Sequence, residues 1–442
     1  MKTQSRIALL GYQALLLFLL PVFLIRLGWR SRRQPAYREH WWERLALYPH
    51  NNPNTQGCIW IHAVSVGETR ACVPLVAAIR ERWPDRSILM THTTPTGREV
   101  GESLYGDQVT RLYLPYDIPG AIDRFLRRFQ PSIGLMVETE IWPGIVHSAG
   151  RHQIPICLIS GRLSERSARA YAKTGLLGRD AFSGMSLICA QTEADAERFR
   201  QRGANRVVVT GNLKFDAPLA DHETSQGQRL RAWLGEHRPV FLAASTREGE
   251  EALILEAWKK TRLHPSRPLL VLVPRHPQRF SEVATLIHDA GDPYVRKTEM
   301  PSCAESNALA FPSDQILSDS VNVVLGDTMG EMAIWYRAAD LAFIGGSLLP
   351  LGGQNLIEAL ARACPVLIGL HTFNFNQVTQ EALAAGAAVR VNTPDSLVDQ
   401  AQELLKDSAR RKQMGEAGQA FVARHQGSAH RTLDQLAPFV KS

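Results

Sequence analysis

Apolar residues dominate the start of the chain and then recur in short runs separated by polar, helix-like segments. Residues 7 to 24 are almost entirely apolar, and the interruptions are Gly11, Tyr12, Gln13 and Pro21. A helix of that length just covers the hydrocarbon core of a bilayer, which is roughly 30 Å thick. The pattern therefore predicts an N-terminal membrane anchor.

A basic collar of six arginines follows this apolar segment. No small-residue cleavage site is present after it, so we favour an uncleaved anchor over the alternative of a signal peptide. Because basic flanks stay on the cytoplasmic side of a bilayer, the collar predicts a single anchor with the rest of the chain on the cytoplasmic face. We assign residues 1–34 to the anchor and collar. The arginines are Arg26, Arg30, Arg32, Arg33, Arg38 and Arg44.

Short apolar runs alternate with amphipathic segments over residues 35–220. The runs are nearly continuous in apolar residues, as in parallel strands that helices cover on both faces. This alternation predicts a doubly wound, Rossmann-like α/β domain. The predicted strands are 58–66, 87–94, 109–115, 132–138, 155–160, 186–190 and 207–211, and the predicted helices include 70–83 and 122–129.

A polar stretch from residue 216 to 239 predicts an exposed linker, after which the alternation restarts. We assign residues 221–442 to a second Rossmann-like domain with C-terminal helices, and we expect the stretch 396–440 to pack back onto the first domain. Ligands of such sheets lie beyond the carboxyl ends of the strands, so the two domains are expected to face a central cleft. The predicted strands are 240–246, 268–274, 321–327, 341–346, 365–369 and 387–391.

The overall composition indicates the kind of partner that the chain binds and the redox state of its compartment. Hydrophobic residues make up 45% of the chain, as in globular proteins, and the net charge of +7 favours an anionic partner or a membrane surface. The six cysteines form no CxxC pair and lie mostly in apolar stretches, which indicates buried thiols in a reducing compartment. They are Cys58, Cys72, Cys157, Cys189, Cys303 and Cys364.

Several motifs of nucleotide and metal chemistry are missing from the sequence. No GxGxxG follows the first strand of either domain, and no P-loop pattern occurs, which argues against dinucleotide redox chemistry and P-loop hydrolysis. There is also no DxD, HExxH or close His/Cys/Asp cluster of the kind that makes a strong metal site. We therefore expect no metal or other cofactor, and we expect Arg275 and helix N-termini to stabilise a leaving phosphate instead.

The glycine-rich loop within residues 343 to 369 is the clearest candidate binding site. Its glycines permit positive φ and close approach to a ligand, and a helix that begins near Asn355 would direct N–H groups at a phosphate or a polyol. Glu358 lies one helical turn later, on the same face. The alternative is a loop shaped by turn chemistry alone, with Asn355 as a helix cap.

Glu68 is a candidate general base because it follows the first predicted strand, near the N-terminus of a helix. A helix N-terminus favours the charged carboxylate, so we expect Glu68 to be ionised near neutral pH and ready to accept a proton. The alternative is a helix-capping glutamate.

Glu138 and Glu140 follow another strand. If that strand continues, the two side chains share a face, where they would either orient a polyhydroxyl acceptor or pair with arginines.

Two further loops suit an anionic nucleotide. Arg275 and His276 follow a strand directly, where the guanidinium suits a phosphate and the imidazole adds a donor, with a solvent-exposed turn as the alternative. Met329, Gly330 and Glu331 end another strand, where a base ring would rest against Met329, although turn formation alone also explains Gly330.

The segment STREGEE, residues 245–251, predicts a structural helix cap. Ser245 or Thr246 would cap the helix, and Glu248 or Glu250 would favour its first turn.

Seven ordered motifs resemble those of the 3-deoxy-D-manno-octulosonic acid (Kdo) transferases, over almost the whole chain. The resemblance implies a GT-B glycosyltransferase attached to the inner membrane. The implied reaction is an inverting, metal-independent transfer of Kdo from CMP-Kdo to a lipid A precursor, lipid IVA, in lipopolysaccharide core biosynthesis. The motifs are YREHWWERL (37–45), WIHAVSVGE (60–68), ETEIWP (138–143), TGNLKFD (210–216), PRHPQRF (274–280), GDTMGE (326–331) and GGQNLIEA (352–359).

The resemblance also implies roles for individual residues. Glu68, in the SVGE motif, would be the catalytic base, with the acceptor on the first domain and CMP-Kdo on the second. Many members have histidine where this chain has Gln354, which puts only an outer contact in doubt. The implied partners are CMP-Kdo, a lipid A precursor and anionic phospholipid, without nucleic acid. The implied CMP-Kdo contacts are Arg275, His276, Met329, Gly330, Glu331, Asn355, Leu356, Ile357 and Glu358.

The residues alone are also compatible with two other functions. A GT-B sugar-nucleotide epimerase would also use two facing domains and carboxylates, although a soluble nucleotide sugar requires neither an anchor nor a basic collar. A non-catalytic, membrane-tethered nucleotide-sugar binding protein would retain the fold without turnover.

Overall fold

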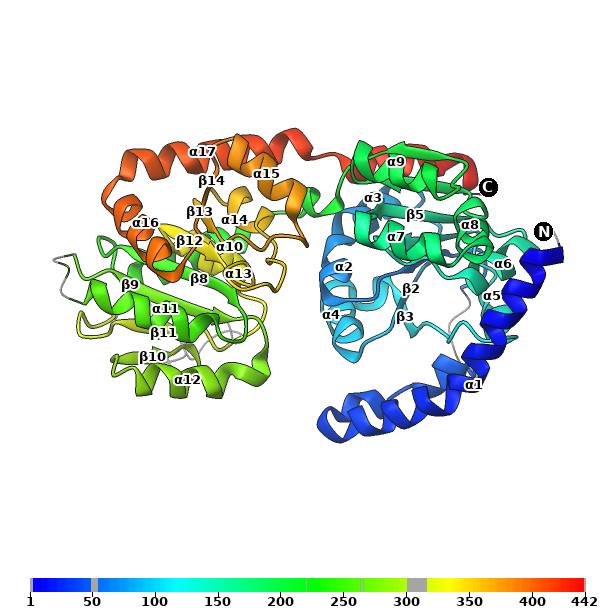
Figure 1. Ribbon diagram of the computed structural model, residues 1–442, viewed down its shortest axis with the longest axis horizontal. Helices are drawn as coiled ribbons and strands as arrows, with labels where there is room; N and C mark the ends of the chain where they lie inside the picture. Colours follow the sequence, from blue (N-terminus) through cyan, green and yellow to red (C-terminus); the bar gives the residue numbers. More distant parts are fainter. Residues whose placement is uncertain are drawn as a thin grey trace. The chain divides into compact units, whose positions relative to one another are not determined.

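The computed structural model of the chain divides into two compact units (Figure 1). Unit 1 consists of Met1–Pro218 and His425–Ser442, and unit 2 of Leu219–Arg424. The structure describes residues 3–48, 55–219, 221–262, 264, 266–299 and 316–440.

Unit 1 is built on a seven-stranded, all-parallel sheet in the order β3-β2-β1-β4-β5-β6-β7. The predicted doubly wound domain is therefore confirmed. The strands are β1 (Ile59–His62), β2 (Ile88–His92), β3 (Thr110–Tyr113), β4 (Ile133–Val137), β5 (Ile156–Gly161), β6 (Leu187–Ala190) and β7 (Val207–Val209). The helices are α1 (Thr3–Arg33), α2 (Val66–Ala71), α3 (Val73–Arg82), α4 (Pro95–Tyr105), α5 (Ala121–Phe129), α6 (Pro143–Arg151), α7 (Glu165–Lys173), α8 (Leu176–Ser183), α9 (Glu193–Gln201) and α18 (Ser428–Leu436).

Two apolar cores lie on opposite faces of this sheet, because successive strand side chains point to opposite sides. Trp60 of β1 belongs to the core beneath α5, α6, α8 and α9, whereas its neighbours Ile59 and Ile61 belong to the core beneath α3 and α18. The five inner strands β1, β2, β4, β5 and β6 are thus buried on both faces, which explains why the sequence showed apolar runs without alternation.

The end of the chain belongs to unit 1, not to the second domain over 221–442 that the sequence predicted. Leu433 and Leu436 of α18 complete one of the two cores of unit 1. The carboxylate of Asp216 accepts the N–H groups of Gly427 at 2.7 Å and Ala429 at 2.6 Å, which caps α18. Only the final part of the stretch 396–440 therefore packs as expected, while the part up to residue 424 stays in unit 2.

Unit 2 is built on a second seven-stranded, all-parallel sheet, in the order β10-β11-β9-β8-β12-β13-β14. The strands are β8 (Val240–Thr246), β9 (Leu269–Pro274), β10 (Tyr294–Arg296), β11 (Val323–Leu325), β12 (Leu341–Ile344), β13 (Val366–Ile368) and β14 (Ala388–Arg390). The helices are α10 (Asp221–Leu234), α11 (Glu250–Trp258), α12 (Phe280–Asp289), α13 (Met332–Ala338), α14 (Ile357–Ala361), α15 (Asn376–Ala384), α16 (Pro394–Lys406) and α17 (Ser408–His425).

The predicted exposed linker over 216–239 is wrong for most of its length, because α10 occupies it. Leu230, Trp233 and Leu234 are buried on one side of that helix, which packs against α13. Polar contacts hold the same helix on the unit, because Arg231 pairs with Asp340 at 2.8 Å and Glu223 with Arg362 at 2.6 Å. The edge strand β10 was not predicted either.

Each sheet has one point where the strand order reverses direction, between β1 and β4 in unit 1 and between β8 and β12 in unit 2. Loops after the strands diverge at such a point, which leaves a crevice where α/β proteins bind ligands. The candidate residues can be located against these two points.

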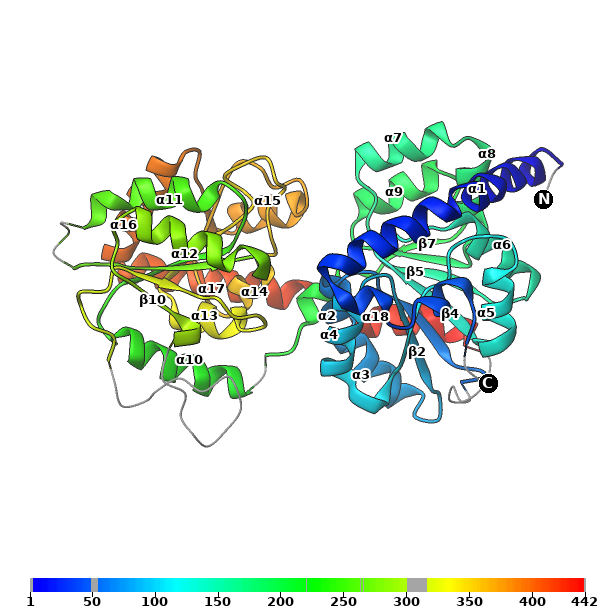
Figure 2. The same cartoon turned by 90° about the horizontal axis from the view of Figure 1, so that it is seen from below.

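Among the described residues, one helix is long and apolar enough to cross a membrane, Gln4–Arg32 within α1 (Figure 2). The buried thiols that the sequence predicted are confirmed at Cys58, Cys72, Cys157, Cys189 and Cys364. Cys303 lies outside the described residues.

Candidate functional site

Glu68 lies in the first turn of α2, directly after the carboxyl end of β1. Ser65 and Glu68 form a reciprocal capping box: the Ser65 hydroxyl accepts the N–H of Glu68 at 3.3 Å. Oε2 of Glu68 accepts the N–H groups of Val64 at 2.6 Å and Ser65 at 3.3 Å. The side chain is therefore held beside the crevice between β1 and β4 with one of its oxygens occupied.

The pKa of Glu68 is raised to about 7, which corrects the expectation of a carboxylate fully ionised at neutral pH. Burial of the side chain is the largest cause, followed by the negative charge of Glu138. The hydrogen bonds from Val64 and Ser65 oppose the increase but do not cancel it. A group with a pKa near 7 is well matched to accepting a proton at neutral pH.

Glu138 and Glu140 follow β4, on the other side of the same crevice. The strand ends at Val137, and Glu138 adopts a left-handed conformation with φ of +60°, so the condition under which Glu138 and Glu140 would share a strand face is not met. Oε1 of Glu138 lies 2.5 Å from Nζ of Lys214. Oε2 of Glu140 accepts Nε1–H of Trp142 at 2.8 Å. Glu138 therefore pairs with a lysine, whereas the alternative drawn from the sequence was a pair with arginines.

His62 ends β1 and was not singled out in the sequence, although it belongs to the quoted motif WIHAVSVGE. Its ring is completely buried, and Nδ1 lies 2.9 Å from the hydroxyl of Thr91. Nε2 points to Glu140, 3.9 Å from Oε2. Burial lowers the pKa of His62 to about 3, so the imidazole is neutral. No local sequence pattern marks this histidine, because its contacts come from Thr91 on β2 and from Glu140 after β4.

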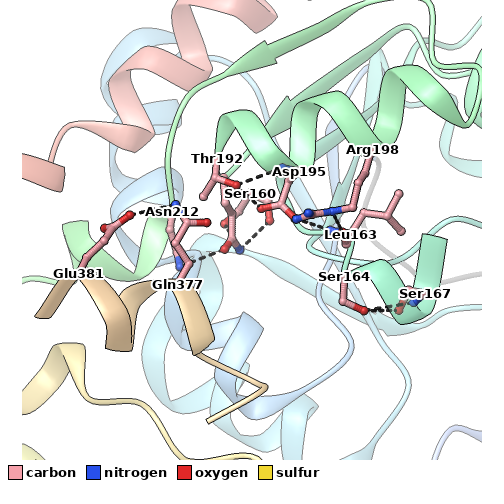
Figure 3. A network of polar contacts seen from close by, with 11 residues as sticks. Ser160, Leu163, Ser164, Ser167, Thr192, Asp195, Arg198, Asn212, Gln377 and Glu381 are labelled. Carbon is pink, nitrogen blue, oxygen red and sulfur yellow. Dashed lines mark hydrogen bonds and ion pairs between the residues drawn. The ribbon is translucent and has the colours of Figure 1, made fainter. Parts of the chain in front are cut away.

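A network of polar side chains beyond β5 and β6 fixes the segment that carries Lys214 (Figure 3). Ser160 accepts Nε2–H of Gln191 at its carbonyl, 3.0 Å away, and Gln191 Oε1 accepts Nδ2–H of Asn212 at 3.3 Å. Oδ1 of Asn212 then accepts the N–H of Lys214 at 3.0 Å. The motif TGNLKFD is thereby tied to the carboxyl edge of the sheet.

A second part of the same network fixes the loop after β5 (Figure 3). The Asp195 carboxylate accepts the hydroxyl of Thr192 at 2.6 Å and the N–H of Leu163 at 2.9 Å. Asp195 also pairs with Arg198 at 3.0 Å. These contacts hold Leu163, in the loop after β5, to the first turn of α9.

In unit 2, Glu250 holds the glycine-rich loop in place. Oε2 accepts the N–H groups of Gly346 at 2.6 Å and Arg247 at 2.9 Å, and Oε1 accepts the N–H of Leu348 at 3.0 Å. Gly345 packs so closely on β8 that a Cβ there would lie 2.4 Å from the carbonyl oxygen of Ser245. The prediction that Glu248 or Glu250 merely favours a helix start missed this role, which joins residues almost a hundred positions apart.

The helix after the loop starts later than predicted. α14 begins at Ile357, and Oδ1 of Asn355 accepts the N–H of Ile357 at 3.1 Å. Asn355 therefore precedes the helix as a capping residue and does not share a helical face with Glu358. Leu356 and Ile357 are buried, which leaves their backbone as the part able to meet a ligand.

Arg275 and His276 directly follow β9, next to β8. The N–H of Arg275 donates to the carbonyl of Thr246 at 3.0 Å, which fixes the turn. Burial, followed by the charges of Arg247 and Arg275, lowers the pKa of His276. A neutral imidazole beside two guanidinium groups is suited to an anionic ligand.

Met329, Gly330 and Glu331 follow β11. Met329 is 53% exposed, and Gly330 has φ of +90°, so both are available to a flat ring. The side chain of Glu331 is buried: it accepts the hydroxyl of Thr328 and lies 3.7 Å from Nζ of Lys297. A ligand would thus meet the backbone of Glu331, not its carboxylate.

The predicted residues fall into two groups, one in each unit. Glu68, Glu138 and Glu140 lie together beside the strand-order reversal of unit 1, and the charges of Glu138 and Glu140 act on Glu68. The predicted nucleotide contacts all follow the carboxyl ends of β9, β11 and β12, which lie around β8 in unit 2.

Comparisons with known proteins match both units. Residues 39–217 match the family described as 3-deoxy-D-manno-octulosonic-acid transferase, and residues 313–421 match glycosyl transferases group 1. A 3-deoxy-D-manno-octulosonic acid transferase of Bordetella pertussis is 45% identical over 86% of this chain and 86% of its own. One of Haemophilus influenzae is 35% identical over 97% of this chain and 98% of its own.

Solved structures share the two-domain GT-B fold at low identity. A glycosyltransferase from Rickettsia africae has a TM-score of 0.58 at 12% identity and covers 88% of this chain and 100% of its own. A UDP-GlcNAc 2-epimerase from Neisseria meningitidis has a TM-score of 0.56 at 15% identity and covers 86% and 99%. At these identities the likeness concerns the fold alone.

Proposed function

Because the chain belongs to the Kdo transferase family of glycosyltransferases, we propose that it transfers Kdo from CMP-Kdo to a lipid A precursor, lipid IVA, with inversion and without a metal. The observation that carries the mechanism is the position of Glu68. A partly buried carboxylate with a pKa near 7 lies at the strand-order reversal of unit 1, where an acceptor sugar would bind.

In the proposed reaction, Glu68 accepts the proton of an acceptor hydroxyl group. The acceptor oxygen forms a bond to the anomeric carbon of Kdo while the bond from that carbon to the CMP phosphate oxygen breaks. The electron pair leaves with CMP, and the proton remains on Glu68. Attack from the face opposite CMP inverts the configuration at that carbon.

Glu138 and Lys214 have a supporting role in this proposal. The charge of Glu138 raises the pKa of Glu68 and so makes it a stronger base. Lys214, which is held 2.5 Å from Glu138, keeps that carboxylate in one position. Glu140, with its partner Trp142, is left to orient the hydroxyl groups of the acceptor.

CMP-Kdo is assigned to unit 2 in this proposal. Arg275 and His276 would meet the phosphate, and Met329, Gly330 and the backbone of Glu331 the base. Asn355 to Glu358 would bind the ribose through side-chain and backbone groups. The arginine charge takes the place of a metal in neutralising the leaving phosphate.

We place the enzyme on the cytoplasmic face of the inner membrane, where its lipid acceptor and anionic phospholipid are present. The basic residues after the apolar segment and the one helix apolar enough for a membrane support this placement.

A single assay tests the proposal. The purified chain is incubated with CMP-Kdo and lipid IVA, with and without EDTA, and the products are followed by mass. We expect Kdo-bearing lipid in both samples, and the mass also counts the units added. Free Kdo, an epimerised sugar nucleotide or unchanged substrates would instead support hydrolysis, an epimerase or a binding protein.

A further inference from the structure

α1 has two apolar faces, of which the protein partly covers one. At 100° per residue, Leu9, Tyr12, Leu16, Leu20 and Phe23 point in one direction, toward unit 1. Leu16 and Leu20 pack on a core of unit 1, Leu9 is buried, and Phe23 stacks on Tyr116 with ring centroids 5.7 Å apart. The helix runs beside α6 and α8 (Figure 2).

The opposite face of α1 is a stripe of large apolar side chains exposed to solvent. At the same 100° per residue, five of them fall within about 60° of one another, opposite the packed residues. An apolar stripe of this length on an otherwise folded unit marks an interaction surface. The residues are Ile7 (65% exposed), Phe18 (80%), Val22 (56%), Ile25 (72%) and Trp29 (56%).

A hydrogen bond holds the middle of α1 to unit 1. The hydroxyl of Tyr12 donates to Oδ2 of Asp117 at 2.9 Å, and the same oxygen accepts the N–H of Gly144, in the first turn of α6, at 2.8 Å. Asp117 is only 4% exposed, and burial raises its pKa to about 7. The apolar segment of α1 is thus fixed to a polar group of the folded unit.

This attachment is incompatible with α1 crossing a bilayer. If residues 7 to 24 spanned the hydrocarbon core, Asp117 and the start of α6 would lie at hydrocarbon depth beside Tyr12. The charge of Arg6 acts on His147 of α6, as does that of Arg151, so charged groups flank the N-terminal part of α1 as well. Placing such groups in hydrocarbon is strongly unfavourable.

Basic residues accompany the exposed stripe. Arg26 and Arg32 are exposed, and Arg30 lies over the ring of Tyr37, 5.6 Å from its centroid. Arginines beside an apolar stripe that contains a tryptophan are typical of a helix that binds the boundary between head groups and acyl chains. Their charge favours an anionic surface.

We propose that α1 lies along the surface of an anionic phospholipid bilayer, with Ile7, Phe18, Val22, Ile25 and Trp29 inserted and unit 1 attached to its other face. The helix does not cross the bilayer, in contrast to the sequence prediction of an anchor that spans it. Both ends of α1 then lie on the same side of the membrane as unit 1. This inference concerns topology and does not require the proposed donor or acceptor.

Labelling of cysteines that are added one at a time tests the topology in spheroplasts. Gln4→Cys places a thiol near the start of α1, and Gln201→Cys places one at an exposed position on unit 1. The unsubstituted chain, whose described cysteines are all buried, gives the background. We expect a membrane-impermeant maleimide to label neither variant in intact spheroplasts and both after lysis. Labelling of Gln4→Cys alone in intact spheroplasts means that α1 spans the membrane and overturns the proposal.

Binding of the purified full-length chain to lipid vesicles tests the inserted face. We expect Phe18→Ser with Ile25→Ser to lower binding to phosphatidylglycerol vesicles at least tenfold, and Arg26→Gln with Arg32→Gln to weaken it there but not on phosphatidylcholine. Leu176→Ser, at an exposed leucine of α8, is the matched control and should bind as the parent does. Thermal unfolding confirms that each variant is folded, and equal binding by all of them contradicts the proposal.

Discussion

At the scale of the residue, Glu68 shows how two local effects compete. Its place in a capping box and at a helix N-terminus favours the charged form, and burial next to Glu138 favours the neutral one. The sequence revealed the first effect only, since burial and a charge 70 positions away depend on the fold. The raised pKa follows from the tertiary structure.

This balance predicts a pH dependence. A base works only when deprotonated, so kcat/KM should rise as the pH increases through about 7, the pKa of Glu68. Replacing Glu138 with Gln removes a negative charge that raises this pKa, so the rise should move to lower pH. Initial rates between pH 5 and 9 measure both. An unchanged midpoint in the variant would show that Glu68 does not set the profile.

Glu68→Gln should lower kcat by about 10²–10⁴-fold, the usual contribution of a general base. Glutamine can still serve in a capping box, so the thermal stability should stay close to that of the parent. CMP affinity should also persist, because the proposed nucleotide contacts belong to unit 2. Glu102→Gln, an exposed glutamate on α4, is the matched control. Full transfer by Glu68→Gln would remove this residue from the mechanism.

At the scale of the element, the glycine-rich loop owes its shape to a side chain from another helix. Glu250 accepts three backbone N–H groups, two of them from the loop itself. Glycines made the loop recognisable in the sequence, but its partner lies 96 and 98 positions earlier. The start of α14 was predicted too early for a related reason, because an Asn355 cap resembles a helical turn in sequence.

Removing the Glu250 side chain should lower the stability of unit 2. Glu250→Ala leaves the N–H groups of Gly346 and Leu348 without an acceptor in a buried place, and we expect a loss of about 2–4 kcal/mol in the free energy of unfolding. CMP binding should weaken with it. Glu248→Ala, at an exposed neighbour, should change stability by less than about 0.5 kcal/mol. Urea unfolding and calorimetric titration with CMP measure the two effects, and equal stabilities would contradict the role of Glu250.

At the scale of the whole molecule, alternation of apolar and amphipathic segments was sufficient to predict two doubly wound units and nearly all of their strands. It was not sufficient to assign the ends of the chain. α18 is an ordinary amphipathic helix whose partners, α3 and the Asp216 carboxylate, are more than two hundred positions away. Similarly, α1 is apolar on both faces, and its composition did not reveal that unit 1 partly covers one of them.

The attachment of α18 can be tested by removing its cap. Asp216→Ala eliminates the acceptor for the N–H groups of Gly427 and Ala429, and we expect unit 1 to lose about 1–2 kcal/mol of stability. Limited proteolysis should then cleave more readily after residue 425. Asp434→Ala, which breaks only an exposed ion pair with Arg82, should leave both readouts unchanged. A cleavage rate in Asp216→Ala equal to that of the parent would show that the Asp216 carboxylate does not hold α18 on unit 1.

Because unit 1 combines segments from both sides of unit 2 in the sequence, it cannot be completed during synthesis until α18 has left the ribosome. Unit 2, which occupies a continuous stretch of sequence, can fold earlier, while the sheet of unit 1 still lacks Leu433 and Leu436 over one face. A chain that stops shortly after residue 424 would therefore damage the unit made first and spare the one made second. For a nascent chain whose first helix is already apolar and exposed, early contact with a lipid surface would protect unit 1 from aggregation until its final piece arrives.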